Sequence, residues 1–318
     1  MLVLSGGTGT PKLLEGLKNI LPEEEITVVV NTAEDMWVSG NLVTPDIDTI
    51  LYLFSRKLDT AKWWGIKNDT FMTYEALRSL GHNETMMLGD QDRATNIMRS
   101  DLLRAGYSLT EATQELTRAF AIRSKILPMS DNPVKTMVTT PAGKMHFQEF
   151  WIKEHGKPEV IEVVQEGVEK ASISPAVLEA LEKEEYVLIG PSNPITSIGP
   201  ILALKGMKEL LRKKTVIAVS PIIGKEPVSG PAGKLMTARG LDVSSAGVVD
   251  CYGDILDIMI LDERDTYSIS ALKDAACKIL VADTLMTNVE KSTALARFVV
   301  DALDSDNIVQ KIPEKLKR

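Results

Sequence analysis

The chain opens with a short apolar run, a glycine-rich turn and an amphipathic stretch. Met1–Leu4 is uninterrupted apolar sequence, Ser5–Pro11 holds three glycines, and Lys12–Ile20 places its apolar residues at helical spacing. Ile26–Val30 then has the β-branched composition of a buried strand. The pattern predicts a βαβ unit, which requires a parallel sheet and a right-handed crossover.

The second half of the chain returns to alternating strands and helices. Short apolar runs occur at Tyr186–Ile189, Thr215–Val219, Ile255–Leu261 and Lys278–Val281, with helical patterns between them. The fold class predicted from this alternation is α/β, with a Rossmann-like, doubly wound and mostly parallel sheet.

The middle of the chain lacks strong strand signals from residue 59 to residue 124. Phe71–Leu80, Gln91–Ala105 and Thr110–Ala121 each have helical spacing with polar caps or glycine breaks. We therefore expect an inserted helical subdomain. The predicted division is a Rossmann-like nucleotide- or phosphate-binding domain of residues 1–58 and 125–318, with residues 59–124 as the insert.

Three further segments complete the predicted outline. Thr32–Pro45 has no clear periodicity and resembles an active-site loop, and Asp46–Ser55 looks helical. Val134–Thr140 and Lys144–Trp151 alternate like the strands of an antiparallel hairpin. The charged tail Lys311–Arg318 is expected to fray.

Composition narrows the class of protein. The 318 residues are 44% hydrophobic and 25% charged, and no apolar run reaches the roughly eighteen residues of a membrane span. We expect a cytoplasmic protein with no membrane partner. The formal net charge of −8 argues against nonspecific nucleic-acid binding, which depends on Lys and Arg contacts to phosphates.

The glycine-rich turn is the first candidate site. Its glycines follow a strand and open a helix, so backbone N–H groups are available to an anion, and Lys12 could neutralise a diphosphate. The spacing matches neither the dinucleotide fingerprint, which needs a third glycine at Lys12, nor a P-loop. Packing of helix on strand is the structural alternative.

Two acidic groups are also candidates, each with a plain structural alternative. Asp46 and Asp48 could bind Mg²⁺ or orient a substrate hydroxyl, or could simply stabilise a helix start. Asp90, Asp92 and Arg93 form a second dense charge cluster, for which a solvated helix start is the plain structural alternative.

Polar loops follow two later strands, where open α/β sheets bind ligands. Gly190–Pro200 carries hydroxyls, an amide and prolines, and Ser220–Lys234 repeats that composition. The histidines are scattered and no nucleophile elbow is present. Zinc-dependent and covalent mechanisms therefore lack their residues. The remaining mechanism is positioning of the substrates with neutralisation of their charge, which is how phosphoryl transfer is usually catalysed.

Long ordered strings of this sequence resemble the 2-phospho-L-lactate transferase family of deazaflavin coenzyme F(420) biosynthesis. Besides Gly190–Pro200 and Ser220–Lys234, the matching strings are SGGTGTPK at 5–12, VNTAED at 30–35, WVSGN at 37–41, PDIDT at 45–49 and DTLM at 283–286.

The resemblance implies a phosphotransferase of class EC 2.7.8. Such an enzyme joins the hydroxyl of the deazaflavin Fo to 2-phospho-L-lactate, or to its enolpyruvyl counterpart, delivered as a guanosine diphosphate ester. GMP is released, the product is the glutamate-free coenzyme, Mg²⁺ is the cofactor, and the family expectation is a homodimer. The sequence leaves open which donor is used.

The resemblance also implies roles for individual residues. Asp48 would hold Mg²⁺ or orient Fo, with Thr49, Asp90 and Arg93 also binding Fo, and Asp48, Asp46 and Arg93 forming the catalytic group. Gln91 stands where relatives often carry a basic residue. The residues expected to bind the diphosphate and guanosine (GDP or GMP) are Gly6, Gly7, Thr8, Gly9, Thr10, Lys12, Ser192, Asn193, Thr196 and Ser197.

Two other classes of protein compete with this hypothesis. A regulatory protein that binds nucleotide sugars, of the gluconeogenesis-factor type, has a similar glycine turn, but the matches at 45–49 and 190–200 favour the transferase. A nicotinamide dehydrogenase is disfavoured because the third glycine is missing and the second strand ends in neutral Asn31.

Overall fold

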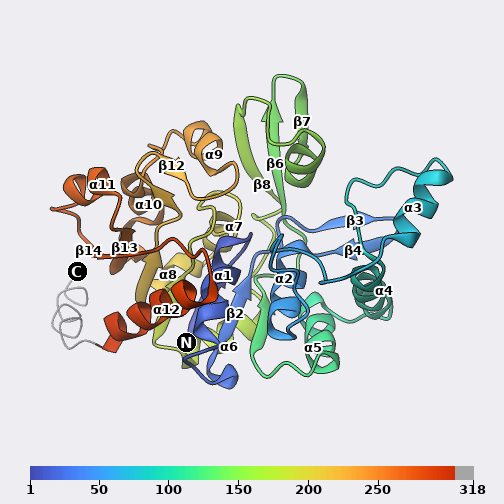
Figure 1. Ribbon diagram of the computed structural model, residues 1–318, viewed down its shortest axis with the longest axis horizontal. Coiled ribbons are helices and arrows are strands. Elements are labelled where there is room, and N and C mark those ends of the chain that lie inside the picture. The colour runs from blue at the N-terminus through green and yellow to red at the C-terminus, as the bar shows by residue number, and fades with distance from the viewer. Residues whose placement is uncertain (305–318) are drawn as a thin grey trace.

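A seven-stranded parallel sheet forms the centre of the molecule in the computed structural model, which describes residues 1–304 (Figure 1). The predicted tail at 311–318 lies outside the described residues. The strand order is β14-β13-β10-β9-β1-β2-β5, and every adjacent pair in it is parallel. The sheet consists of β1 (Leu2–Ser5), β2 (Thr27–Val30), β5 (Lys125–Pro128), β9 (Tyr186–Ile189), β10 (Thr215–Val219), β13 (Ile258–Asp262) and β14 (Lys278–Ala282).

This order is that of a doubly wound Rossmann-like sheet, with one strand added at an edge. The chain proceeds outward from β1 through β2 to β5, then returns and proceeds the other way from β9 to β14. The direction of winding therefore switches between β1 and β9. Loops that leave the carboxyl ends of these two strands border the crevice where open α/β sheets bind ligands.

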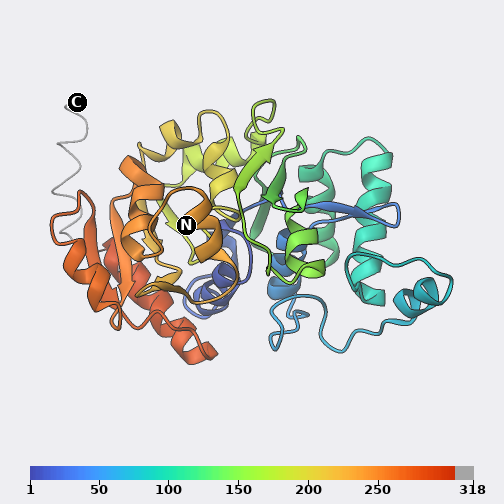
Figure 2. The ribbon, with the colours of Figure 1, turned by 90° about the horizontal axis from the view of Figure 1, so that it is seen from above.

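Helices cover both faces of the sheet (Figures 1 and 2). One apolar core packs α1 (Gly9–Leu17), α2 (Pro45–Phe54), α5 (Leu109–Ala119) and α12 (Val289–Asp304) against one face. The other core packs the helices that follow β5, β9 and β10 against the opposite face. These are α6 (Pro175–Lys183), α7 (Gly199–Ala203), α8 (Met207–Leu211), α9 (Ala232–Ala238) and α10 (Ser245–Tyr252), and the short α11 (Thr266–Ala271) lies beyond them.

A three-stranded antiparallel sheet stands apart from the central one, above it in Figure 1. It consists of β7 (Gly143–His146), β6 (Lys135–Thr140) and β8 (Glu162–Glu166), in that order. The predicted hairpin is confirmed over its first part only, because Glu149–Lys153 forms a π-helix rather than more strand. Its third strand, β8, was missed.

The predicted loop at 32–45 is wrong in one respect. It contains a short antiparallel hairpin, β3 (Met36–Val38) with β4 (Asn41–Val43), which extends from the sheet toward α3 (Met72–Ser79) and α4 (Asp90–Arg104). The three predicted helices of the middle segment are present as α3, α4 and α5. The division into two domains at 58/59 and 124/125 stays a prediction.

The remaining short elements close turns around these layers, and they include a two-stranded ribbon after β10. They are 3-10 turns at Glu23–Glu25 and Gly253–Ile255, with β11 (Ile222–Ile223) and β12 (Glu226–Pro227) forming the ribbon. Among residues 1–304, no helix is long and apolar enough to span a bilayer.

Candidate active site

The glycine turn after β1 and the loop after β9 interlock at the switch point. Thr10 N–H donates to Ser192 Oγ at 3.1 Å, the two hydroxyls lie 2.7 Å apart, and Ser192 Oγ also donates to the Gly6 carbonyl. A Cβ atom at Gly9 would stand 1.9 Å from the Pro191 carbonyl oxygen, and one at Gly190 would stand 2.1 Å from Thr10 Oγ1. Glycine is required at position 9 because the two backbones approach so closely, and at position 190 because the Thr10 side chain fills the space.

This interlock divides the predicted phosphate-binding residues into two groups. The side chain of Ser192 and the N–H of Thr10 hold the loops together, and Asn193 Oδ1 accepts the Ile195 N–H at 2.9 Å within its own turn. Among the described contacts, the N–H groups of Thr8 and Gly9 at the start of α1 are not engaged. They are the donors that an anion could reach.

A carboxylate already occupies one donor of the turn. Asp46, at the start of α2, accepts Gly7 N–H at 2.8 Å through Oδ1 and Asn31 Nδ2 at 2.9 Å through Oδ2. Burial raises the pKa of Asp46 to about 6, although both hydrogen bonds oppose the shift. Asp46 is thus held against the glycine turn by Asn31, the residue that follows β2.

Three more buried carboxyl groups lie near Asp46. Glu34 and Asp35, in the loop after β2, are within electrostatic reach of Asp46, and Asp48 on α2 is within electrostatic reach of Asp35. Burial, followed by the charge of Asp46, raises the pKa of Glu34 well above its usual value, and burial does the same for Asp35. Asp35 Oδ1 is buried and accepts no hydrogen bond from the described residues. We call Glu34, Asp35, Asp46 and Asp48 the acidic cluster.

One buried arginine offsets part of this charge. Arg99 of α4 is fully buried and forms an ion pair with Asp48, with further bonds to the Leu42 carbonyl at 3.2 Å and to Asn96 Oδ1 at 3.0 Å. Burial still raises the pKa of Asp48 above its usual value, because the guanidinium compensates only partly. Arg99 lowers the pKa of Asp48 and Asp35 only, and the pKa values of all four carboxyl groups stay raised. The four groups therefore retain protons or require another positive charge.

Arg99 is the functional residue that sequence reasoning missed. In α4 the polar residues Asp92, Asn96 and Arg99 are buried, while the apolar Ile97 and Met98 are exposed. A periodicity argument assigns the apolar residues to the interior. The polar residues Asn96, Arg99 and Ser100 lie at helical spacing, and this spacing could have indicated a polar face of α4 that points inward.

Two other predicted residues of α4, Asp90 and Arg93, are engaged by neighbouring parts of the protein, and their predicted roles stay predictions. Arg93 donates to both carboxylate oxygens of Glu84, at 3.0 and 2.7 Å. Asp90 accepts from Thr70 Oγ1 at 2.6 Å and from the N–H groups that begin α3, which holds its pKa below the usual range. Neither residue has a described contact with Asp46 or Asp48. Asp92 and Arg93 are buried, so the alternative of a solvated helix start is wrong for them.

The remaining predicted residues make contacts within the protein, most of them near the glycine turn or on α2. Thr49 Oγ1 donates to the Pro45 carbonyl at 2.8 Å, a bond within α2. The Thr196 carbonyl accepts from Asn31 Nδ2 at 3.2 Å, and Ser197 lies against Gly6 and Gly7. Lys12 Nζ lies 5.5 Å from the centre of the Trp63 ring, and burial lowers the pKa of Lys12.

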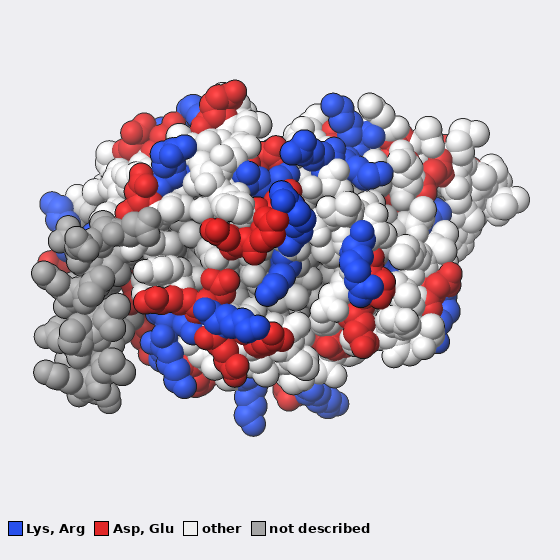
Figure 3. Space-filling model, turned by 90° about the horizontal axis from the view of Figure 1, so that it is seen from below, with Lys and Arg blue, Asp and Glu red and all other residues white. Residues whose placement is uncertain are grey.

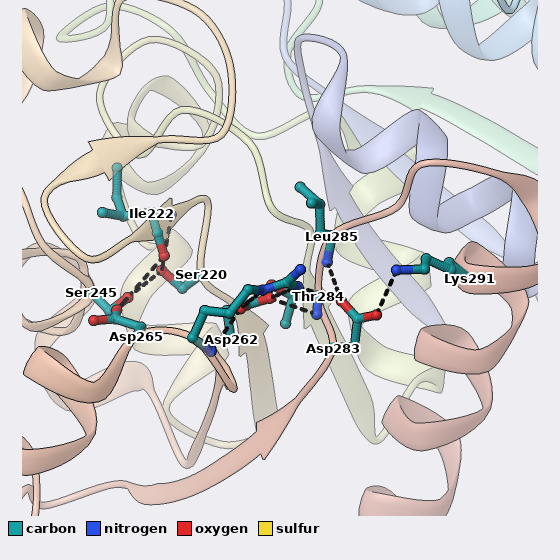
Figure 4. Close-up of polar contacts among 10 residues, drawn as sticks. Ser220, Ile222, Ser245, Asp262, Asp265, Asp283, Thr284, Leu285 and Lys291 are labelled. Carbon is teal, nitrogen blue, oxygen red and sulfur yellow. Dashed lines mark hydrogen bonds and ion pairs between the residues drawn. The ribbon is translucent and has the colours of Figure 1, made fainter.

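A second polar cluster lies at the ends of β10, β13 and β14 (Figure 4). Asp262 accepts from the Arg264 side chain and from Thr284 N and Oγ1, while Asp283 accepts from Arg264 and from Lys291 at 2.9 Å. Ser245 Oγ donates to Asp265 Oδ2 at 2.7 Å and contacts Ser220 Oγ. We call Asp262, Asp265 and Asp283 with these donors the paired cluster, because each of its carboxylates has donors.

The residues of Ser220–Lys234 are also engaged within the fold. Lys234 Nζ donates to the carbonyl oxygens of Gly156 and Lys157 at 2.8 and 2.7 Å. On the face seen from below, basic and acidic side chains are interspersed (Figure 3). That face therefore lacks the single-sign field that draws nucleic acid to a protein.

The fold is that of a Rossmann-like α/β protein in which the glycine turn after β1 lies beside buried carboxyl groups. A family model described as 2-phospho-L-lactate transferase CofD matches residues 1–297. The chain belongs to this family and is a transferase.

Individual relatives agree with the family match. A 2-phospho-L-lactate transferase of Methanosarcina acetivorans is 62% identical over 305 residues, covering 96% of this chain and 99% of the relative. One of Methanococcoides burtonii is 60% identical over 300 residues, covering 94% and 98%.

A solved structure supports the fold alone. A protein of the UPF0052 family from Bacillus halodurans superposes with a TM-score of 0.64 at 17% identity, covering 94% of this chain and 97% of that one.

Proposed function

We propose that this enzyme transfers a 2-phospho-L-lactyl or enolpyruvyl-phosphate group from a guanosine diphosphate ester to the terminal hydroxyl of Fo, releasing GMP. The observation that best supports this proposal is the position of the acidic cluster beside the N–H groups of Thr8 and Gly9, which have no described partner. A diphosphate bound at the turn would bring negative charge next to buried carboxyl groups. Such a site suits a cation-assisted displacement rather than a covalent intermediate.

Mg²⁺ would fit this place if it were held by few protein ligands. Among residues 1–304, no three His, Cys, Asp or Glu side chains form a ready metal site. Mg²⁺ commonly binds one or two carboxylates together with substrate phosphates and water. Asp35, with its unpartnered buried oxygen, and Asp46 would be those ligands, whereas Asp48 is paired with Arg99. The ion would supply charge neutralisation at the diphosphate.

The roles of the protein residues follow from their contacts. The N–H groups of Thr8 and Gly9 would bind the diphosphate. Asp48 would accept a hydrogen bond from the attacking Fo hydroxyl and orient it, while Arg99 fixes the direction of the carboxylate. Displacement at the phosphorus nearer the acid then forms the new phosphodiester and breaks the bond to GMP.

The experiment is turnover with purified protein, Fo, Mg²⁺ and each guanosine diphosphate donor. Mass spectrometry would follow GMP and the phosphodiester-linked deazaflavin. We expect both products with at least one donor, and the ratio of rates identifies the preferred one. Binding of Fo and GDP without any product, with both donors supplied, would contradict the proposed reaction.

A further inference from the structure

The backbone N–H groups at the start of the glycine turn differ in what they contact. Gly7 N–H donates to Asp46 Oδ1 at 2.8 Å, whereas the N–H groups of Thr8 and Gly9 have no partner among the described contacts. A carboxylate of the protein therefore occupies the first of three consecutive donors, and the other two are open to an anion.

The backbone shape of the turn brings these three N–H groups together. Gly7 has a φ of 59°, in the left-handed region, and Thr8 follows in a right-handed conformation with φ −105° and ψ −14°. Consecutive residues of opposite hand form a nest, which is a concavity where successive backbone N–H groups face one anion. The donor that Asp46 occupies thus belongs to the same concavity as the two open donors.

Asn31 holds the Asp46 carboxylate at this place. The fully buried Asn31 side chain donates through Nδ2 to Asp46 Oδ2 at 2.9 Å and to the Thr196 carbonyl at 3.2 Å. Asn31 Oδ1 accepts Ala33 N–H at 3.0 Å, which fixes the orientation of the amide. A Cβ atom at Gly6 would stand 3.0 Å from Asp46 Oδ2, so the carboxylate lies directly against the turn. The protein thus keeps a negative charge at the nest without any ligand.

A phosphate oxygen and the Asp46 carboxylate would compete for Gly7 N–H. Both are anions that accept strong hydrogen bonds from backbone N–H groups, and two like charges at one donor repel each other unless a cation lies between them. A diphosphate that uses the whole nest must therefore displace Asp46 Oδ1. The displaced carboxylate would then be available to a cation, since Mg²⁺ commonly binds carboxylates together with substrate phosphates.

We infer that Asp46 stands in for a phosphate group at Gly7 N–H in the free protein, and that a diphosphate with its cation displaces it; this inference rests on the proposed function. A nucleotide alone must break the Asp46–Gly7 hydrogen bond and approach the charge of the carboxylate, so it binds weakly. Each of the two ligands then raises the affinity for the other by the same factor. Asp46 thereby makes the nest selective for a diphosphate that carries its cation.

The first test is titration calorimetry of GDP with the full chain, in EDTA and in Mg²⁺. In EDTA, Asp46→Ala should bind GDP about tenfold more tightly than wild type, because a charge-assisted hydrogen bond no longer has to be broken. Asp48→Asn is the control, since Asp48 lies on the same helix but has no described contact with the glycine turn. Its metal-free affinity should stay within about threefold of wild type. Equal tightening in both variants would overturn the inference, because loss of charge alone would explain it. Circular dichroism melting would verify that both variants fold.

The second test is a crystal structure of wild type with GDP and Mg²⁺, which needs no variant. A phosphate oxygen should lie within hydrogen-bond distance of Gly7 N, with the Asp46 carboxylate turned away from it. Asp46 still bonded to Gly7 N–H in that complex would overturn the inference, and so would wild-type affinity for GDP that is as high in EDTA as in Mg²⁺. Failure of wild type to bind GDP under either condition would instead remove the proposed function, and the inference with it.

Discussion

The acidic cluster and the paired cluster both lie at the carboxyl ends of strands of one sheet, yet the pKa values of Asp262 and Asp283 are lowered whereas those of the acidic cluster are raised. Burial would raise the pKa of Asp262, but Arg264 and Thr284 donate enough hydrogen bonds to hold it below its usual range. The donors of Lys291 and Arg264 likewise lower the pKa of Asp283. In the acidic cluster, burial outweighs the donors and raises every one of the four pKa values.

The difference separates a polar network whose carboxylates have enough donors from one whose carboxyl groups lack them. A network with all its donors present stabilises the fold and needs no ligand. Buried carboxyl groups with too few hydrogen-bond donors destabilise the free protein when they are ionised. Groups with such raised pKa values concentrate at functional sites, where a ligand or cation can supply the missing donors or positive charge. The following variants test that distinction.

The largest effect is expected at Asp48. Asp48→Asn should lower kcat on the order of 10³-fold, because the carboxylate that orients the attacking hydroxyl is lost. Steady-state GMP release measures it, with unfolding by urea to verify the fold. Asp265→Asn, a fully buried aspartate of the paired cluster, should keep normal kcat in its folded fraction. Equal loss of turnover in both variants would remove the distinction between the clusters.

A stability effect without a catalytic one is expected at Asp262. Asp262→Asn removes the acceptor of the Arg264 and Thr284 bonds, so the free energy of unfolding should fall by about 2 kcal/mol at pH 7. Because the folded pKa of Asp262 is lowered, wild type itself loses this stabilisation as the pH falls below the unfolded value of 3.8. The two proteins should therefore converge in acid. A constant difference from pH 7 down to pH 2 would contradict this account.

The smallest effect is a pH dependence at Asp92, which accepts from Tyr52 Oη at 2.7 Å. Burial and then the charge of Asp48 raise the pKa of Asp92 from 3.8 to about 7. A raised carboxyl pKa favours the folded state below pH 3.8, and this advantage is lost as the pH rises through 7. Urea unfolding at pH 5 and at pH 8 measures this effect. From the lower to the higher pH, the free energy of unfolding of Asp92→Asn should rise relative to that of wild type by on the order of 1 kcal/mol. If the difference in unfolding free energy between the two proteins is the same at both pH values, the pKa of Asp92 is not raised.

Much of the sheet could be predicted from the sequence, because buried parallel strands are short apolar runs. The glycine turn and the loop after β9 could also be predicted locally, because each is a run of glycine, proline and hydroxyl residues that directly follows such an apolar run. β5 was missed because only Ile126 and Leu127 are strongly apolar in it, and β8 because its strand residues are largely polar. Those strands exist because tertiary neighbours pair with them.

The candidate site was less predictable than the fold. Asp46 and Asp48 could be selected from the chain, but Arg99 belongs to a helix whose polar side faces inward. Its partner is 51 residues away, so no local pattern connects them. Glu84 likewise holds Arg93 from a loop with no periodicity.

The interlock of Gly9 with Pro191, and of Thr10 with Ser192, has a consequence for synthesis in the cell. The two loops joined by the Thr10–Ser192 hydrogen bond are 182 residues apart in the chain. Domains form as their residues leave the ribosome, N-terminal parts first. A nascent chain that has emerged only as far as β8 contains the glycine turn but not the loop after β9, which packs against that turn. The crevice is therefore completed late, and ligand binding can stabilise only a chain that has folded past β9.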